Sequence, residues 1–361
     1  MNRCNTINMY TLGIDVHKHT STLVLIDDSY RVLWEQTIRS HPHDFNQLLT
    51  QIPVSTTGLP VALEPVGPWR WIVALLTEAG LHPHIAHPRK VALIAKSTQK
   101  TDRLDARTLA ELLCAGYLPE ARIVPDTIYQ LRLLLRERQH VVRMRVATIN
   151  RLHGIATTQG LHTIACGNPI TKAGARSIMM GTNTTLKELH GLIAELDRRV
   201  GVFDARCATL GRTIPEVQRL MTMPGVGIIT ALTIHAEVGV WRDFASAKQL
   251  VSYAGLCPRQ RASGTTRRCG PITKTGSSYL RTALVEAAMR IHPKSAPELF
   301  AMVERLKPAT GAKKARVALA RKLLTIMWHL IQTETTYDPK RVVVPAIDNR
   351  NLSQPDTVSG T

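Results

Sequence analysis

The sequence lacks paired cysteines and long apolar runs, and each absence excludes a class of protein. Its six cysteines are scattered, with no C-x-x-C pair among them, so neither a disulfide framework nor a cysteine-based zinc site is expected. No run approaches the roughly 18 apolar residues of a membrane span. The opening stretch, MNRCNTINMYTLGID, lacks the apolar core of a signal peptide. These absences predict a cytoplasmic protein that has no membrane partner.

Acidic residues are also scarce. The chain has 46 Lys and Arg against 27 Asp and Glu, which gives a net charge of +19 over 361 residues. An excess of this size indicates a polyanionic partner, because Lys and Arg bind phosphates and release condensed counterions. Charge alone does not separate DNA from RNA. The length allows two or three domains, and the hydrophobic content of 44% is enough for sizeable cores.

Residues 1–125 predict an α/β domain. Three β-rich runs occupy residues 11–38, and they suggest an antiparallel meander because only short polar turns separate them. Helix-like and strand-like segments then alternate, at 44–52, 61–65, 69–80, 84–86 and 102–115. This order of elements, with carboxylates at strand ends, is typical of an RNase H-like domain.

The rest of the chain is mainly helical by its pattern. Residues 126–213 predict a helical, coiled-coil-like segment with long helices at 128–153 and 185–213. Residues 214–335 predict a second globular domain, and residues 336–361 a mobile tail without periodicity. The apolar stripes of the two long helices predict that they pair, either with each other or with another copy of the chain.

Arginines line the polar side of the helix expected at 128–153. Because this segment contains a single acidic residue, Glu137, we interpret its polar side as a surface that faces nucleic acid; an ordinary solvated face is the alternative. The contacts expected from this surface are those of Arg132, Arg136 and Arg143.

Four acidic residues of the first domain are candidate metal ligands: Asp15, Glu64, Asp102 and Asp105. Asp15 lies within a strand between apolar neighbours, where an unpaired carboxylate is costly. Asp102 and Asp105 are three residues apart, so they share one face of a helix. Carboxylates that converge repel one another unless divalent cations bind between them, and hard oxygen ligands suit Mg²⁺ or Mn²⁺. Two such ions can support a displacement at phosphorus.

Each acid also has a simpler interpretation when it is taken alone. Asp15 could pair with His17 or Lys18. Asp102 could cap the N-terminus of a helix, and Asp105 could pair with a neighbouring arginine. The histidines near these strands raise zinc as an alternative metal, but their spacing fits no zinc pattern, so we interpret them as surface residues. The strand placement of the acids and the basic chain together favour the metal site.

Glycines separate two helix-forming stretches within residues 219–238. Gly225 and Gly227, in the segment MPGVG, allow a tight turn, and the amides that open the next helix can face an anion. This pattern is typical of a helix–hairpin–helix, which contacts DNA phosphates without reading the sequence. An ordinary helix–helix turn is the alternative.

A basic stretch without acids surrounds Ser263. No acid occurs between Asp243 and Glu286, and glycines at 264, 270 and 276 predict an irregular loop that leads into a helix at 278–291. The basic residues expected to bind phosphate are Arg259, Arg261, Arg267, Arg268, Lys274 and Arg281. A serine beside arginines can attack phosphorus, because the cations stabilise the charge that develops.

This reasoning does not single out one hydroxyl group. Other candidates in the same stretch are Thr265, Thr266, Ser277 and Ser278. The loop could also bind phosphate without any covalent chemistry.

Five segments, in this order and spacing, resemble the IS110 family of insertion-sequence transposases, which includes the IS1111 group and the Piv-type DNA invertases. The segments are GIDVHK at 13–18, LEP at 63–65, KTDRLDARTLAELL at 100–113, MPGVG at 223–227 and YAGLCPRQRASGTTRRCGPITKTGSSYLR at 253–281. The resemblance covers about residues 10–335.

The resemblance implies specific roles for these residues. It implies a RuvC-like domain whose DEDD metal site is Asp15, Glu64, Asp102 and Asp105, and a transposase domain whose nucleophile is Ser263. The family usually has Ser-Ser-Gly at this point, whereas this chain has Ala262-Ser263-Gly264, so Ser263 is the single candidate there. In the family the serine forms a covalent phosphoserine link to DNA while the metal site assists.

The resemblance also implies partners. Relatives choose donor and target DNA with a structured bridge RNA, and they work as homo-oligomers, dimers or tetramers, whose active site is completed between subunits. By the same resemblance, we expect this chain to bind DNA and a guide RNA at the bacterial nucleoid.

The sequence leaves alternatives to a transposase open. A RuvC-like structure-specific nuclease would use the same four acids to activate water and would not need Ser263. A Piv-type site-specific invertase would use the same residues to invert a DNA segment. A non-catalytic nucleic-acid-binding protein would carry the acids only as structural ion pairs.

Overall fold

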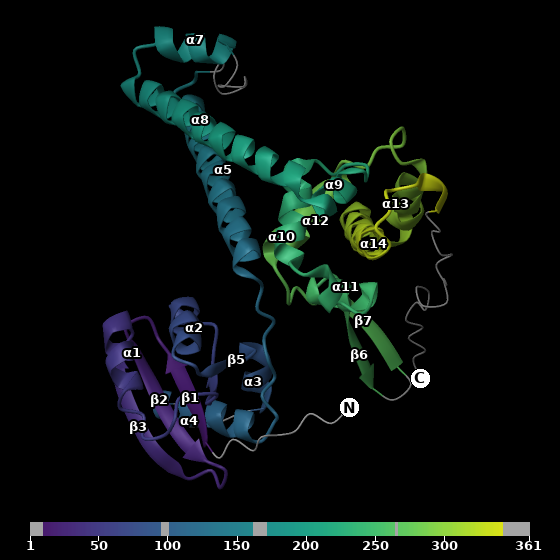
Figure 1. The fold of residues 1–361 in the computed structure, drawn as a ribbon. Helices are drawn as coiled ribbons and strands as arrows, with labels where there is room; N and C mark the ends of the chain where they lie inside the picture. The colour runs from purple at the N-terminus through teal and green to yellow at the C-terminus, as the bar shows by residue number, and fades with distance from the viewer. Residues whose placement is uncertain (1–9, 95–100, 162–171, 264–265, 342–361) are drawn as a thin grey trace, which may run out of the picture. The chain divides into compact units, whose positions relative to one another are not determined.

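The computed structural model describes residues 10–94, 101–161, 172–263 and 266–341, which belong to two compact units (Figure 1). Unit 1 is Met1–Ile123 and unit 2 is Val124–Thr361. Among the helices in these described ranges, none combines the length and the apolar character that crossing a bilayer requires.

A five-stranded mixed sheet, in the order β3-β2-β1-β4-β5, forms the centre of unit 1. Its strands are β1 Tyr10–Val16, β2 Thr20–Asp27, β3 Val32–Arg39, β4 Pro60–Leu63 and β5 His82–Ile85. The first three are antiparallel neighbours, which confirms the expected meander, while β4 pairs parallel with β1 and with β5. The aliphatic runs of β1 and β2 are buried on both faces, so both faces of the sheet must be covered.

Helices cover the two faces of this sheet: α1 Pro42–Leu49, α2 Trp69–Glu78, α3 Pro88–Ile94 and α4 Asp102–Cys114. One face packs Ile14 of β1 with Phe45 of α1 and Ile72 of α2. The other face packs Val24 of β2 with Ala106 of α4. A mixed sheet between helices is consistent with the RNase H-like domain expected from the sequence.

Unit 2 is mostly helical, as the sequence predicts. Its helices are α5 Asp126–Thr158, α7 Lys172–Met180, α8 Thr184–Thr213, α9 Pro215–Met221, α10 Ile228–Val238, α11 Ala247–Tyr253, α12 Ser278–Met289, α13 Pro297–Thr310 and α14 Ala312–Gln332, with 3-10 turns at Trp241–Asp243 and Pro339–Arg341. Helices α5 and α8 lie side by side and antiparallel (Figure 1). Their direction follows from two ion pairs, since Arg138 pairs with Asp204 and Arg145 pairs with the earlier Asp197.

The apolar core of unit 2 lies among α10, α12 and α14, where Leu232, Leu284 and Leu323 are fully buried. The first residues of the segment expected to be a mobile tail, 336–361, contact this core. The backbone N–H of Tyr337 donates to Thr222 Oγ1 at 2.9 Å, and the Tyr337 side chain packs against the core. Residues 342–361 lie outside the described residues.

The sequence predicted an irregular loop over residues 253–281, and this prediction is wrong for the central part of the segment. β6 Pro258–Ser263 and β7 Thr266–Ile272 pair antiparallel as a two-stranded sheet. One of the glycines that suggested irregular structure is required by local packing instead. At Gly276, for example, an added Cβ would lie 1.9 Å from the backbone carbonyl oxygen of Tyr253, so the residue permits a close approach of two segments.

Candidate functional site

Asp15 and Glu64 lie at the carboxyl ends of two parallel neighbouring strands. Asp15 is the penultimate residue of β1 and Glu64 directly follows β4, while the register pairs Ile14 with Leu63 one position earlier. Ile14 and Leu63 both pack on the face covered by α1 and α2. Because side chains alternate along a strand, the acids that follow them belong to the opposite face, which α4 covers.

Helix α4 brings the other two acids to this face. Asp102 and Asp105 lie in its first turn, and Thr101 is its N-cap, with a side chain that accepts a backbone N–H of that turn. The interpretation of Asp102 as the cap is therefore wrong. Gly13 allows α4 to approach β1 closely, since a Cβ added there would lie 1.9 Å from the carbonyl oxygen of Ala106.

His17 contacts two of these acids. Its Nε2 lies 3.2 Å from Asp15 Oδ2 and 3.3 Å from Asp102 Oδ1. One ligand atom from each of the three residues lies within 4.8 Å of the other two. Two carboxylates and an imidazole are donors that suit a divalent cation. Glu64 and Asp105 share the same face of the sheet but are not members of this three-residue group.

The arginines nearest to Asp105 in the sequence have other partners. The guanidinium of Arg103 lies 2.6 Å from the carboxylate of Glu35 in β3. Arg107 pairs with Glu111 of its own helix at 2.7 Å. Arg103 and Arg107 thus pair with other acids, and the structure shows neither of the ion pairs that the sequence allowed between them and Asp105.

Ser263 is the last residue of β6, and its backbone pairs with that of Thr266, the first residue of β7. In the register of the two strands, Arg261 is opposite Arg268, and Ala262 is opposite Arg267. Three basic positions therefore lie within a few residues of the serine along the paired backbone. Residues 264 and 265 lie outside the described residues.

Other candidates in this basic stretch have identifiable local roles. Ser277 caps α12, since its Oγ accepts a backbone N–H of the first turn at 3.3 Å. The guanidinium of Arg281 donates to two backbone carbonyl groups, and burial lowers the pKa of this side chain. Arg259 and Lys274 are exposed. Ser277 and Arg281 thus hold the segment that follows the hairpin, whereas Arg259 and Lys274 face solvent.

The turn between α9 and α10 places its two glycines differently. Gly225 has a φ of +77°, and an added Cβ would lie 2.7 Å from the carbonyl oxygen of Ala287 in α12. Packing within unit 2 therefore requires a glycine at this position. Gly227 is exposed directly before α10, with nothing within 4 Å of an added Cβ. Of the two glycines, Gly227 is thus the one exposed at the surface.

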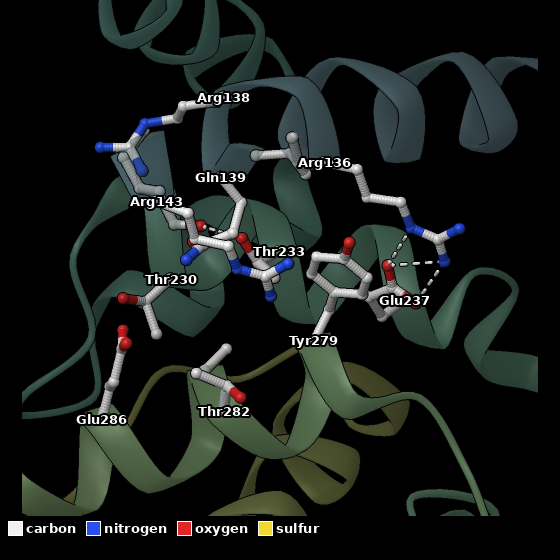
Figure 2. A pocket seen from close by; sticks show the side chains of 13 residues that line it. Arg136, Arg138, Gln139, Arg143, Thr230, Thr233, Glu237, Tyr279, Thr282 and Glu286 are labelled. Carbon is white, nitrogen blue, oxygen red and sulfur yellow. Dashed lines mark hydrogen bonds and ion pairs between the residues drawn. The ribbon is translucent and has the colours of Figure 1, made fainter. Parts of the chain in front are cut away.

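The arginines of α5 do not form a single surface. Arg132 donates to the backbone carbonyls of Ala236 and Glu237 at the end of α10, at 2.6 and 2.8 Å. Arg136 donates to the carboxylate of Glu237 at 3.0–3.1 Å (Figure 2), and this carboxylate side chain is only 4% exposed. Arg132 and Arg136 therefore satisfy acceptors inside unit 2, a structural role that the sequence did not indicate, and their contact with nucleic acid stays a prediction.

Arg143 is exposed and differs from these two arginines. Its guanidinium lies 5.5 Å from the centre of the Tyr279 ring, and the guanidinium of Arg136 lies 5.0 Å from the same ring. These side chains line a pocket among α5, α10 and α12 (Figure 2), to which Gln139, Thr230, Thr282 and Glu286 also contribute. The sequence did not indicate Tyr279, because a lone tyrosine at a helix start belongs to no pattern.

Two family models match this chain. The model described as the transposase IS116/IS110/IS902 family matches residues 217–302, and the model for the DEDD domain of IS110 transposases matches residues 12–158. The second match contains all four candidate acids, and the first contains Ser263.

Several relatives are similar over nearly their whole length. A probable family 20 transposase of Pseudomonas aeruginosa is 30% identical over 349 residues, which cover 92% of this chain and 100% of the relative. The transposase for insertion sequence element IS1111A of Coxiella burnetii is 30% identical over 347 residues, or 90% of each chain. A pilin gene-inverting protein of Moraxella bovis is 26% identical over 350 residues, which cover 91% of this chain and 98% of the relative. The chain therefore belongs to the IS116/IS110/IS902 family of transposases and is a DNA transposase.

Proposed function

We propose that this transposase cleaves and rejoins DNA through Ser263, assisted by a divalent cation held by Asp15, Glu64, Asp102 and Asp105. The observation that carries the proposal is the group of Asp15 in β1, His17 and Asp102 in α4, beside which the strand register and the first turn of α4 favour positions for Glu64 and Asp105. Such an arrangement suits metal-assisted displacement at phosphorus. The DEDD match over the same residues supports it.

The covalent step conserves the energy of the DNA backbone. The Oγ of Ser263 bonds to phosphorus, one phosphodiester P–O bond breaks, and the released strand end leaves as a hydroxyl group that takes up the serine proton. A hydroxyl group of another strand then attacks the phosphoserine and regenerates the serine. Basic positions around Ser263, such as Arg261, Arg267 and Arg268, would stabilise the charge on the reacting phosphate.

The four acids would act by holding the cation at a fixed place. When bound, a divalent cation supplies positive charge that stabilises the departing oxygen. Asp15 is held in a strand and Asp102 in a capped helix turn, so their carboxylates keep one spacing without a rearrangement. Mg²⁺ or Mn²⁺ suits such oxygen donors.

The nucleic acids bound would be donor DNA, target DNA and a structured bridge RNA. The net charge of +19 supports binding to polyanions. Exposed Arg143 beside Tyr279 offers a cation and a ring face to an unpaired nucleotide, and the surface of the α9–α10 turn offers backbone amides to a phosphate. RNA dependence rests on the family resemblance, and co-purification of one discrete RNA species would test it.

We further propose a homo-oligomer, a dimer or tetramer. Apolar side chains remain exposed on both long helices, including Leu133 and Val146 of α5 and Leu192 and Val202 of α8. A second copy would cover part of this surface. Light scattering that shows only monomer, both with and without bound nucleic acid, would contradict this part of the proposal.

Substitution of the acids tests the metal site. Asp15→Asn, Glu64→Gln, Asp102→Asn and Asp105→Asn should each abolish strand cleavage in Mg²⁺ while thermal unfolding changes little. Glu111→Gln in the same α4 helix is the matched control, because it alters an acid that pairs with Arg107 instead. Wild-type cleavage rates in three of the four site variants would overturn the assignment.

Site-specific DNA inversion is a second candidate function, and the similarity to pilin gene-inverting proteins favours it. Inversion and transposition would use the same serine and acids but different arrangements of DNA sites. A plasmid that carries two inverted sites separates them, because an invertase flips the intervening segment without moving it to a new location.

A further inference from the structure

His17 is held in place by hydrogen bonds to its backbone. It follows β1 directly and opens the turn to β2. Its N–H donates to the carbonyl oxygen of Thr20 at 2.9 Å, and its own carbonyl accepts from Ser40 Oγ at 2.8 Å. Ser40 Oγ also lies 2.8 Å from Ser21 Oγ. Contacts from both sides of the turn therefore fix the point from which the imidazole extends.

The distances from the imidazole of His17 to two carboxylates are close to those between ligands of one metal ion. For six-coordinate Mg²⁺ or a similar cation with bonds of about 2.1 Å, adjacent donor atoms lie about 3.0 Å apart and opposite donors about 4.2 Å apart. His17 Nε2 lies 3.2 Å from Asp15 Oδ2 and 3.3 Å from Asp102 Oδ1, and one ligand atom from each of the three residues lies within 4.8 Å of the other two. The two nitrogen–oxygen separations are thus close to those of adjacent donors around one ion.

We propose that His17 is a direct ligand of the divalent cation, through Nε2, beside Asp15 and Asp102. This inference rests on the proposed metal site and adds a nitrogen donor to its oxygen donors. A nitrogen donor improves the binding of transition-metal ions relative to Mg²⁺, which prefers oxygen. The site should therefore favour Mn²⁺ over Mg²⁺ more strongly than four carboxylates alone would.

Pulsed electron paramagnetic resonance of the full-length protein loaded with Mn²⁺ tests the bond itself, without any activity measurement. Electron spin echo envelope modulation detects a ¹⁴N nucleus bonded to Mn²⁺. We expect this modulation in the wild-type protein and its loss in His17→Gln. We also expect the Mn²⁺ Kd of His17→Gln to rise by at least about tenfold, with a smaller change in the Mg²⁺ Kd.

Two further variants separate ligation from folding. His19→Gln alters a histidine of the same turn that is not a member of the ligand group, so it should keep the ¹⁴N modulation. His17→Asp replaces the nitrogen donor by oxygen, so it should bind Mn²⁺ without the modulation. A His17→Asp protein that binds Mn²⁺ shows that the site has folded.

The outcomes distinguish this inference from the proposed metal site. Wild-type protein that binds Mn²⁺ without ¹⁴N modulation would overturn the ligand role of His17 and leave the carboxylate site standing. The same conclusion would follow if His17→Gln kept the modulation and His19→Gln lost it. Folded wild-type protein that binds no Mn²⁺ would overturn both the carboxylate site and the inference.

Discussion

Replacing Gly13 with alanine should push α4 away from β1 and disable the metal site. The added Cβ would lie 1.9 Å from the carbonyl oxygen of Ala106 and 2.8 Å from the backbone nitrogen of Ala110, whereas real Cβ contacts stay above 3.0 Å. Both neighbours are helix backbone, so α4 must move away by about 1 Å to restore that limit. Overpacking of this kind costs about 1–3 kcal/mol of folding stability.

The displacement should weaken the site even in protein that stays folded. Asp102 and Asp105 move with α4, and a shift of about 1 Å exceeds the roughly 0.2 Å tolerance of metal–ligand distances. Displacements of this size can slow catalysis by about 100-fold. We therefore expect Gly13→Ala to unfold at lower urea concentration and to bind Mn²⁺ more weakly by calorimetry.

Gly154→Ala is the matched control for this substitution. Gly154 lies in α5 with nothing within 4 Å of an added Cβ, so alanine should leave stability unchanged or raise it by up to about 1 kcal/mol. Wild-type stability together with wild-type Mn²⁺ affinity in the Gly13→Ala protein would refute the packing argument.

The remaining predictions concern an ion pair, a buried histidine and the metal. Arg136→Ala should lower the free energy of unfolding by about 2–4 kcal/mol, because it leaves buried Glu237 unpaired. Arg143→Ala should instead lower nucleic-acid affinity and change the free energy of unfolding by less than about 1 kcal/mol. Equal losses of stability in urea titrations of the two variants would contradict this difference. Burial lowers the pKa of His235, whose Nδ1 accepts a hydrogen bond from Trp241 Nε1. The contribution of neutral His235 to stability is therefore present above the unfolded pKa near 6.5 and is lost as the pH falls below that value. Urea titrations above and below this pH should show a smaller loss of stability on acidification in His235→Gln than in the wild-type protein. Chelation with EDTA should stop strand cleavage without changing the circular dichroism spectrum, because the core of unit 1 is apolar; unfolding on chelation would indicate a structural metal instead.

Periodicity and turn residues predicted the elements whose pattern is local in the sequence. The strands β1, β2 and β3 alternate with polar turns, and α4 spaces its leucines at helical intervals, so both patterns are local in the sequence. Helix α3 was missed because it buries only Val91 in its seven residues and so has no stripe. The β6–β7 hairpin was missed because arginines and glycines suggest a loop, whereas the partner strand supplies the backbone hydrogen bonds.

The candidate site was predictable where its signal is local. Asp15 at a strand end and Asp102 at a helix start are visible as acids at element boundaries. The internal contacts of Arg132 and Arg136 could not be predicted from local signals, because their acceptors on α10 follow them by more than 100 residues in the chain. Glu137 is the only acid within residues 128–153. The acids that pair with the arginines of α5 come instead from the helices that pack against α5.

Covalent capture of DNA would show whether Ser263 is the nucleophile. The protein is incubated with end-labelled donor DNA and divalent cation, denatured, and examined for label that migrates with the protein. We expect an adduct whose peptide mass maps to Ser263, and we expect Ser263→Ala to lose the adduct while it keeps Mn²⁺ and DNA binding. An adduct that persists in Ser263→Ala or maps to Ser278, or full strand cleavage with no adduct at any time, would contradict this assignment.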